Sequence, residues 1–228
     1  MERIRASFPE FPMPSRLSVL LVLCLAGPLA GQEPESVFTA VCAKCHGASA
    51  EGNAQIMAPS LAGLPHWYGS LQLNKFRDGV RGKHHADLTG AQMQAIAATL
   101  TPELVTAIAS HLETLQPVPI LTPPGADPRR GGELYDEICA KCHRFNGQGE
   151  RAFRSAPLTT LSGWYLAASL RKFREGVRGS HGADLEGPKM REIAVRLGDR
   201  EINDLVAYIA LLAERYPPGE SGRKRAAQ

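Results

Sequence analysis

The chain has 228 residues, of which 43% are hydrophobic and 21% are charged, and its formal net charge is +3. This length suits one or two domains. The small positive balance argues against a nucleic-acid-binding protein, because such a protein needs a dense basic face.

The N-terminal segment, residues 1–31, has the pattern of a secretory signal peptide. Arginines precede an apolar run over residues 17–26, and the small residues Ala30 and Gly31 follow it. The run is too short to span a bilayer comfortably, so we expect cleavage near Ala30 to Gln32, with an uncleaved anchor as the alternative. Cys24 lies inside the run and is expected to leave with it. No later stretch is long and apolar enough to predict a membrane span.

A helix is expected over residues 36–44, because apolar residues recur there at helical spacing. It runs into the motif Cys42-Ala-Lys-Cys45-His46. The C-x-x-C-H spacing is the signature of covalent haem attachment, in which two thiols add to haem vinyl groups and the histidine ligates the iron. Disulfides and a zinc site are weaker alternatives, because both leave the histidine without a role.

Further helices follow in the first half of the chain. One is expected over residues 67–77, with a stop at Gly79, and a short helical pattern covers residues 93–100. Thr101 resembles a helix cap, and the apolar stripe over residues 104–115 predicts the last helix. No alternating strand pattern of useful length appears, so this half is predicted to be all-α.

The second half of the chain repeats the first at a constant offset of 97 residues. The repeated motif is Cys139, Cys142 and His143, so the sequence predicts two covalently bound haem c groups, with His46 and His143 as proximal iron ligands. Between the copies, the proline-rich residues 117–128 predict an extended linker. Asp199 is expected to cap the last helix of the second copy.

The second axial ligand decides whether each iron carries electrons or does chemistry, because six-coordinate iron does not readily bind oxygen or peroxide. Met93 and Met190 occupy equivalent places in the two copies and are the expected ligands. Simple core packing is the alternative for both methionines. The rival ligands, which also repeat at this offset, are His84 and His181.

Other repeated residues suggest partners for the haem. Arg81 and Arg178 lie in a repeated Gly-Val-Arg-Gly turn, and they are expected either to bind haem propionates or to remain solvated. The aromatic pairs at 67–68 and 164–165 are expected to pack beside the haem.

With these motifs the chain resembles dihaem cytochromes of the c4 type, and each half is similar to a class I cytochrome c of the c553 kind. The matching features are the C-x-x-C-H motifs, the middle helix ending in Phe-Arg-Asp/Glu-Gly-Val-Arg-Gly, and the segment Met-x-x-Ile-Ala-x-x-Leu. The first half departs from this pattern at His111, where a tyrosine is missing. The resemblance implies that Met93 and Met190 are the distal ligands and that the protein carries electrons toward a terminal oxidase or reductase.

We therefore predict an all-α protein of two tandem class I cytochrome c domains joined by a proline-rich linker. The expected boundaries are a signal peptide over 1–31, a first domain over 32–116, a linker over 117–128, a second domain over 129–216 and a basic, disordered tail over 217–228.

The expected function is single-electron transfer in the periplasm, without enzymatic activity of its own. The expected partners are redox proteins: a membrane quinol-oxidising complex or another donor, and a terminal oxidase or reductase. The alternatives are a dihaem peroxidase-like enzyme with one open iron position, and a cytochrome subunit of a larger oxidoreductase.

Overall fold

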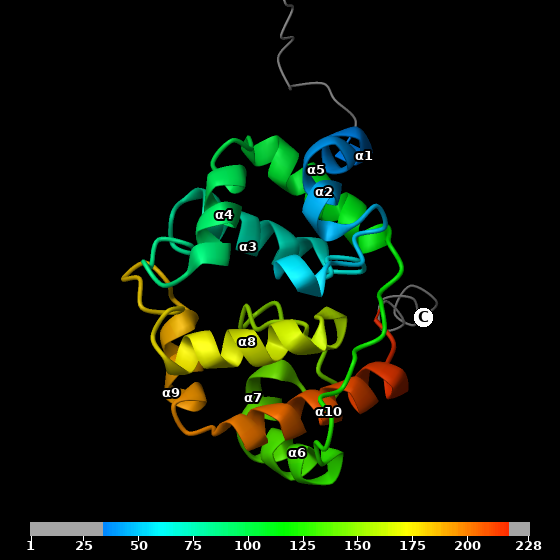
Figure 1. Ribbon diagram of the computed structural model, residues 1–228, viewed down its shortest axis with the longest axis vertical. Coiled ribbons are helices and arrows are strands. Elements are labelled where there is room, and N and C mark those ends of the chain that lie inside the picture. Colours follow the sequence, from blue (N-terminus) through cyan, green and yellow to red (C-terminus); the bar gives the residue numbers. More distant parts are fainter. Residues whose placement is uncertain (1–33, 219–228) are drawn as a thin grey trace, which may run out of the picture. The chain divides into compact units, whose positions relative to one another are not determined.

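The computed structural model describes residues 34–218, which belong to one compact unit. Every regular element in this range is a helix, apart from two isolated bridges between single residues (Figure 1). The predicted all-α class is therefore confirmed. The expected signal peptide and nearly all of the expected tail lie outside the described residues.

The first half opens with a helical stretch in three pieces and continues with four further elements. In order these are α1 (Pro34–Val37), the π-helical turn η1 (Phe38–Cys42), α2 (Ala43–His46), the 3₁₀ turn η2 (Ala54–Ile56), α3 (His66–Arg77), α4 (Leu88–Ala97) and α5 (Pro102–Thr114).

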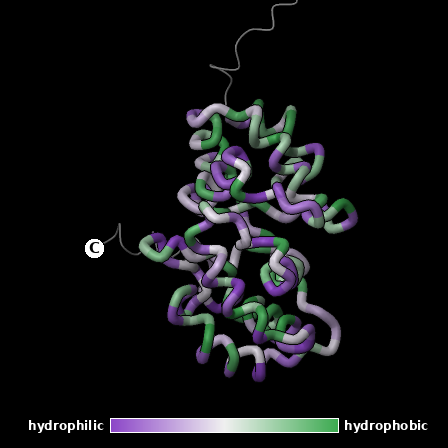
Figure 2. Tube along the Cα trace, turned by 90° about the vertical axis from the view of Figure 1, so that its left-hand side faces the viewer, coloured by the Kyte–Doolittle hydropathy of each residue, from purple (hydrophilic) through white to green (hydrophobic). Residues whose placement is uncertain are grey.

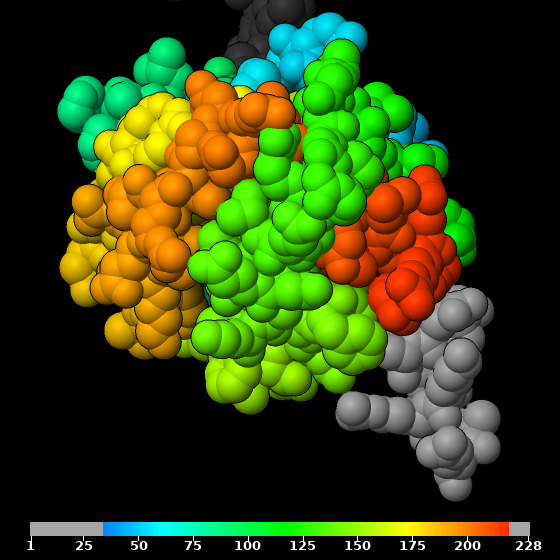
Figure 3. Space-filling model, turned by 90° about the horizontal axis from the view of Figure 1, so that it is seen from below, coloured from blue at the N-terminus to red at the C-terminus, as the bar shows by residue number. Residues whose placement is uncertain are grey.

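The second half repeats this order. Its elements are α6 (Pro128–Leu134), the π-helical turn η3 (Tyr135–Cys139), α7 (Ala140–His143), the 3₁₀ turn η4 (Leu158–Thr160), α8 (Gly163–Arg174), α9 (Gly187–Ala194) and α10 (Asp199–Arg215). Residues 115–127, between α5 and α6, contain no helix. In Figure 3 this connection and α6, both green, lie against α10, which is orange to red.

Capping side chains explain where several helices begin. Thr101 caps α5 as predicted, because its hydroxyl accepts a hydrogen bond from the backbone N–H of Leu104 at 3.3 Å. The expectation for Asp199 is wrong by one position. Gly198 is the cap of α10, and Asp199 is the first helical residue, where its carboxylate accepts hydrogen bonds from the arginines at 171 and 174.

Each half has its own apolar core, and the second core also takes side chains from the first half. Phe38, Val105 and Ile108 belong to the first cluster, which joins α1, η1 and α5. The second cluster is built mainly on α8 and α10, but Leu64 and Tyr68 of the first half belong to it. Burying one large apolar side chain contributes about 1.5–3 kcal/mol, so this shared cluster ties the halves together.

Helix α6 crosses α10 in close backbone contact. A Cβ atom on Gly131 would lie 2.0 Å from the carbonyl oxygen of Asp204, so only glycine permits this approach. The Asp204 side chain is buried, and it accepts hydrogen bonds from the backbone N–H of Asp127 at 2.6 Å and from Nε of Arg130 at 2.7 Å. These contacts hold the start of the helical stretch that leads into the second C-x-x-C-H motif.

Hydrophobic and hydrophilic residues alternate along the helices in Figure 2, as expected for amphipathic elements around a core. Among residues 34–218, no single helix is both long and apolar enough to cross a membrane, although α4 and α5 together, with a sharp bend between them, meet that test by length and composition.

Candidate functional site

Both C-x-x-C-H motifs lie where a π-helical turn passes into a short α-helix. Such turns often occur at functional sites in helices. All four described cysteines are free thiols, with Cys45 and Cys142 exposed and Cys42 and Cys139 partly covered. Burial and the neighbouring thiol raise the pKa of Cys42 to about 11 and that of Cys139 to about 12, so both thiols are protonated at neutral pH.

The histidine of each motif is buried and held by a backbone carbonyl. Nδ1 of His46 donates to the carbonyl of Pro59 at 2.7 Å, and Nδ1 of His143 donates to the carbonyl of Ala156 at 2.9 Å. A carbonyl can only accept, so Nδ1 carries the proton and Nε2 keeps a lone pair, as a metal ligand requires. Burial also lowers the pKa of both histidines, which favours the neutral imidazole. Because the acceptor is backbone, the Pro-to-Ala difference between the halves does not alter this arrangement.

A cavity of about 460 Å³ lies in front of the second motif. Cys139, Cys142 and His143 line it together with Met190 of α9. Its remaining wall is largely apolar, as in most cofactor sites, and includes Leu158, Leu161, Leu166, Leu170, Ile193 and Leu205. These residues therefore fit a haem bound through two thioethers, with a histidine and a methionine within the same cavity.

The two rival histidines lie elsewhere. His84 and His181 line a separate cavity of about 230 Å³ beside the two Gly-Val-Arg-Gly turns, and neither lines the cavity that contains His143. Nδ1 of each accepts a hydrogen bond of 3.2 Å from the backbone N–H two residues further on. The arrangement in the second half therefore brings Met190, and not His181, together with His143.

The methionines lie inside helices that begin earlier than the sequence pattern indicates. Asp87 caps α4 by accepting a hydrogen bond from the N–H of Gly90 at 3.0 Å, and Asp184 accepts one from Gly187 at 3.1 Å near the start of α9. Met93 and Met190 each follow the corresponding aspartate by the same number of residues, and both are partly buried. The first half thus repeats the local setting of Met190 around Met93.

The Gly-Val-Arg-Gly turn packs directly on the first turn of the methionine helix. A Cβ atom on Gly82 would lie 2.3 Å from the carbonyl oxygen of Gly90, and one on Gly179 would lie 2.6 Å from that of Gly187. Both turn glycines also have positive φ, at 84° and 79°. Glycine at these positions therefore allows the turn to lie against the helix and to fix where it begins.

The arginines of these turns are half-buried and donate hydrogen bonds within the protein. Arg81 donates to Gln72 at 2.7 Å and to the hydroxyl of Tyr165, in the other half, at 3.2 Å. Arg178 donates to Ser169 at 3.1 Å. Among the described residues, Nε of Arg81 is buried without a hydrogen-bond partner, and Arg81 lines the second-half cavity, so a haem propionate there would fit as its partner.

Four residues of the first half, which sequence reasoning did not place there, also line the second-half cavity. They are Tyr68, Gln72, Lys75 and Arg81. The aromatic pairs are expected to pack beside the haem, and of these residues Tyr68 and Tyr165 both line the second-half cavity, so Tyr68 reaches the other half. The sequence did mark this region, because the Lys-Phe-Arg segment is repeated exactly in the two halves. Repetition does not reveal, however, which half a side chain faces.

The missing tyrosine of the first half also has a structural counterpart. Tyr208 packs against Tyr135 with ring centroids 5.4 Å apart, and His111 packs against Phe38 at 5.5 Å. His111 therefore fills the same place behind the first motif, and the departure from the family pattern leaves the ring contact intact.

Fold and site together define the class of protein: a helical c-type cytochrome with two haems, both bound covalently. The family model for cytochrome c matches residues 32–116 and 128–213. The chain belongs to the cytochrome c family, as a two-domain member of the cytochrome c4 type. It carries two covalently bound haem c groups, and its family is one of electron carriers.

Three similar proteins illustrate this relationship. The chain is 33% identical over 185 residues to the thiosulfate dehydrogenase electron acceptor of Stutzerimonas stutzeri (strain A1501), covering 76% of this chain and 80% of the relative. It is 29% identical over 186 residues to cytochrome c4 of Azotobacter vinelandii, covering 75% and 83%. The solved structure of reduced recombinant cytochrome c4 from Pseudomonas stutzeri is similar with a TM-score of 0.62 at 25% identity, covering 79% of this chain and 98% of that one.

Proposed function

We propose that this protein is an exported, periplasmic carrier of single electrons whose two irons are each ligated by a histidine and a methionine. The proposed pairs are His46 with Met93 and His143 with Met190. The observation that carries this proposal is the second-half cavity, whose lining includes both His143 and Met190 but not His181.

When bound, the haem supplies a one-electron couple, and a thioether ligand raises its potential. The chain's own residues prepare the site for that role. The carbonyl of Ala156 orients the His143 ring and keeps the proton on Nδ1, so that Nε2 is free for the metal. The apolar wall excludes water, which disfavours the more highly charged oxidised state. Held by both a histidine and a methionine, a bound iron would have no open position for small molecules.

Replacing each methionine tests the proposal. We expect Met190→Ala to abolish the sulfur-to-iron charge-transfer band of one haem and to produce a high-spin signal in the EPR spectrum, and Met93→Ala to do the same for the other haem. His181→Ala and His84→Ala are matched controls that leave both haems low-spin. An unchanged spectrum in Met190→Ala would overturn the ligand assignment. A high-spin component in the unmodified protein that binds peroxide would instead support a peroxidase-like enzyme.

The proposed electron partners follow from the relatives. One of them is named as the electron acceptor of thiosulfate dehydrogenase, which supports a dehydrogenase as one proposed class of donor for this chain. A membrane quinol-oxidising complex is the other proposed donor class, and a terminal oxidase or reductase is the proposed acceptor. Stable co-purification with one of these complexes would favour a permanent subunit over a free shuttle.

Export is proposed from the composition of residues 1–31. N-terminal sequencing of the haem-loaded protein from the periplasmic fraction is expected to begin near residue 32. A protein that keeps its first residues and sediments with membranes would indicate an uncleaved anchor.

A further inference from the structure

We propose that Lys75 and Lys172 are crossed positioning residues. Each lysine comes from one half and holds the methionine helix of the other half, and it thereby sets the reduction potential of the other half's haem. This inference rests on the proposed assignment of Met93 and Met190 as distal ligands.

The first contact runs from α3 to α9. The Lys75 ammonium lies 2.5 Å from Oδ1 of Asp184 and 2.5 Å from Oε2 of Glu186, and the three side chains are only 12%, 4% and 19% exposed. The same Asp184 oxygen accepts the hydrogen bond from the Gly187 N–H at the first turn of α9. One carboxylate therefore joins a cation of the first half to the helix that carries Met190.

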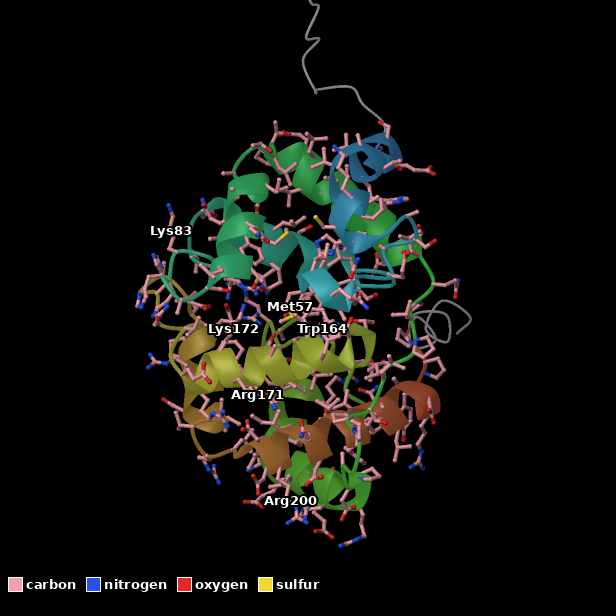
Figure 4. All side chains as sticks on the ribbon, in the orientation of Figure 1. Met57, Lys83, Trp164, Arg171, Lys172 and Arg200 are labelled. Atoms are coloured by element: carbon pink, nitrogen blue, oxygen red, sulfur yellow. The ribbon has the colours of Figure 1, made fainter. Side chains whose placement is uncertain are left out.

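The second contact runs in the opposite direction, from α8 to α4. The Lys172 ammonium lies 2.6 Å from Oδ1 of Asp87 and 2.8 Å from the hydroxyl of Thr89. Asp87 is the cap of α4, the helix that carries Met93. In Figure 4, Lys172 lies on the side of α8 that faces the first half, whereas its neighbour Arg171 lies on the opposite side. The duplication has thus produced two reciprocal contacts across the molecule.

The charges in these contacts are balanced within the protein. Burial by itself raises the pKa of Asp87 and of Asp184, but the hydrogen bond and charge of the facing lysine outweigh it, so the pKa of each carboxyl is lowered overall. Both aspartates are therefore ionised at neutral pH. Removing one lysine would leave a covered carboxylate without its partner, which is costly and displaces the groups around it.

The two contacts are not equivalent in charge. Glu186 in the second half corresponds to Thr89 in the first, so Lys75 faces two carboxylates and Lys172 faces one. Arg154 also pairs with Glu186, at 3.1 Å, so the partner that depends on Lys75 is Asp184. The Lys75 side chain is 12% exposed and that of Lys172 is 30% exposed, so solvent screens the Lys75 charge less. Lys75, Asp184 and Glu186 also line the cavity that contains Met190. Loss of the Lys75 charge is consequently expected to act more strongly than loss of the Lys172 charge.

The test uses the full-length, haem-loaded protein and its two midpoint potentials. The potentials are assigned to the halves by Met93→Ala and Met190→Ala, each of which removes one low-spin haem. We expect Lys75→Gln to lower the second half's midpoint, because loss of a nearby positive charge favours the oxidised iron. An expected change of about tenfold in its oxidised-to-reduced ratio corresponds to about 59 mV for one electron. Lys172→Gln is expected to lower the first half's midpoint by a smaller amount.

Three controls separate this effect from a general loss of structure. Lys75→Arg keeps the charge, so both of its midpoint potentials are expected to differ from those of the unmodified protein by only a small fraction of the shift in Lys75→Gln. Arg200→Gln removes one positive charge from an exposed position at the start of α10, away from α3 and α8 in Figure 4, and is expected to move neither potential. Asp184→Asn keeps an oxygen that can accept the Gly187 N–H and removes a negative charge, so it is expected to raise the second midpoint. If Lys75→Gln does not bind haem, the upward shift of the second midpoint in Asp184→Asn tests the proposal in its place.

The crossed pattern is what the proposal requires. A shift of the first half's midpoint in Lys75→Gln, or equal shifts of both midpoints, would overturn it and leave the lysines as interface contacts only. Failure of the proposed function would be distinguishable, because it would appear in the unmodified protein as a haem that is not low-spin and six-coordinate.

Discussion

Replacing Tyr135 with phenylalanine tests how the second motif is held from behind. The ring is completely buried, and its hydroxyl donates to the carbonyl of Arg144 at 2.7 Å. Arg144 directly follows His143, so this bond anchors the chain just beyond the proximal histidine. Phe38 occupies the corresponding place in the first half and lacks the hydroxyl. The hydroxyl also lies 3.5 Å from the carbonyl of His143, which keeps a hydrogen bond from the N–H of Gly149. Tyr135→Phe therefore removes the short hydrogen bond and this long contact, and keeps the ring contact with Tyr208.

The expected cost follows from what the lost hydroxyl leaves behind. A buried acceptor with no remaining partner costs up to about 3 kcal/mol, whereas a typical hydrogen bond contributes about 1 kcal/mol. The carbonyl of Arg144 still accepts the N–H of Gly147 at 3.2 Å, so the lower figure applies. We expect a loss of about 1 kcal/mol in the free energy of unfolding, which lowers Tm by about 2–4 °C for a protein of this size.

Urea unfolding of the haem-loaded protein, followed by far-UV circular dichroism, measures this loss. Tyr208→Phe is the matched control, because Tyr208 is only partly buried and its hydroxyl makes no hydrogen bond to another described residue. Its expected change is below about 0.5 kcal/mol. An unchanged stability in Tyr135→Phe, or an equal loss in both variants, would refute the reasoning.

Three further predictions concern backbone strain, pH and close packing. Arg144 has φ 66° and ψ 161°, where Gly47 stands in the first half, so Arg144→Gly should raise the free energy of unfolding by about 1 kcal/mol, measured as a higher Tm. The folded state lowers the pKa of Asp87 and of Asp184. Their ionised forms therefore stabilise the fold at pH values above the ordinary carboxyl pKa of about 3.9, and this stabilisation is lost as the pH falls from there through the lowered pKa. The urea midpoint, measured as a function of pH, should fall in this acidic range, and the fall should be smaller in Asp184→Asn. Gly131→Ala should destabilise the protein by about 2 kcal/mol or more in urea unfolding, because its Cβ would meet a backbone oxygen of α10.

Sequence patterns predicted the elements whose causes are local. The two haem motifs and the Thr101 cap could be recognised without a structure, since each depends on residues a few positions apart. The duplication could be recognised too, because the same letters recur at a constant offset of 97 residues. The beginnings of α4 and α9 were missed, although their signal was present as Asp87 and Asp184 at equivalent positions. An aspartate before a helix is an ordinary capping residue, and here it extends the helix back beyond the apolar pattern.

The choice between methionine and histidine as distal ligand illustrates the limit of such reasoning. Met190 and His181 both repeat at the same offset, so periodicity supports them equally. In the folded chain His181 lies at a turn that lines a different cavity, whereas Met190 projects from α9 into the cavity that contains His143. A helix presents one face to the cavity, and only its packing decides which face that is.

The order of residues along the chain was sufficient to determine the cofactor, because two thiols and an imidazole must be close neighbours to attach one haem. It also determined that the chain contains two such units. Only the packing of the helices decided that Tyr68 and Lys75 of the first half complete the cavity of the second. Their distance along the chain from Met190 does not indicate whether they lie near it. Helices pack so that apolar surface is buried and covered charges are paired, and this packing brings together residues that are far apart in the sequence.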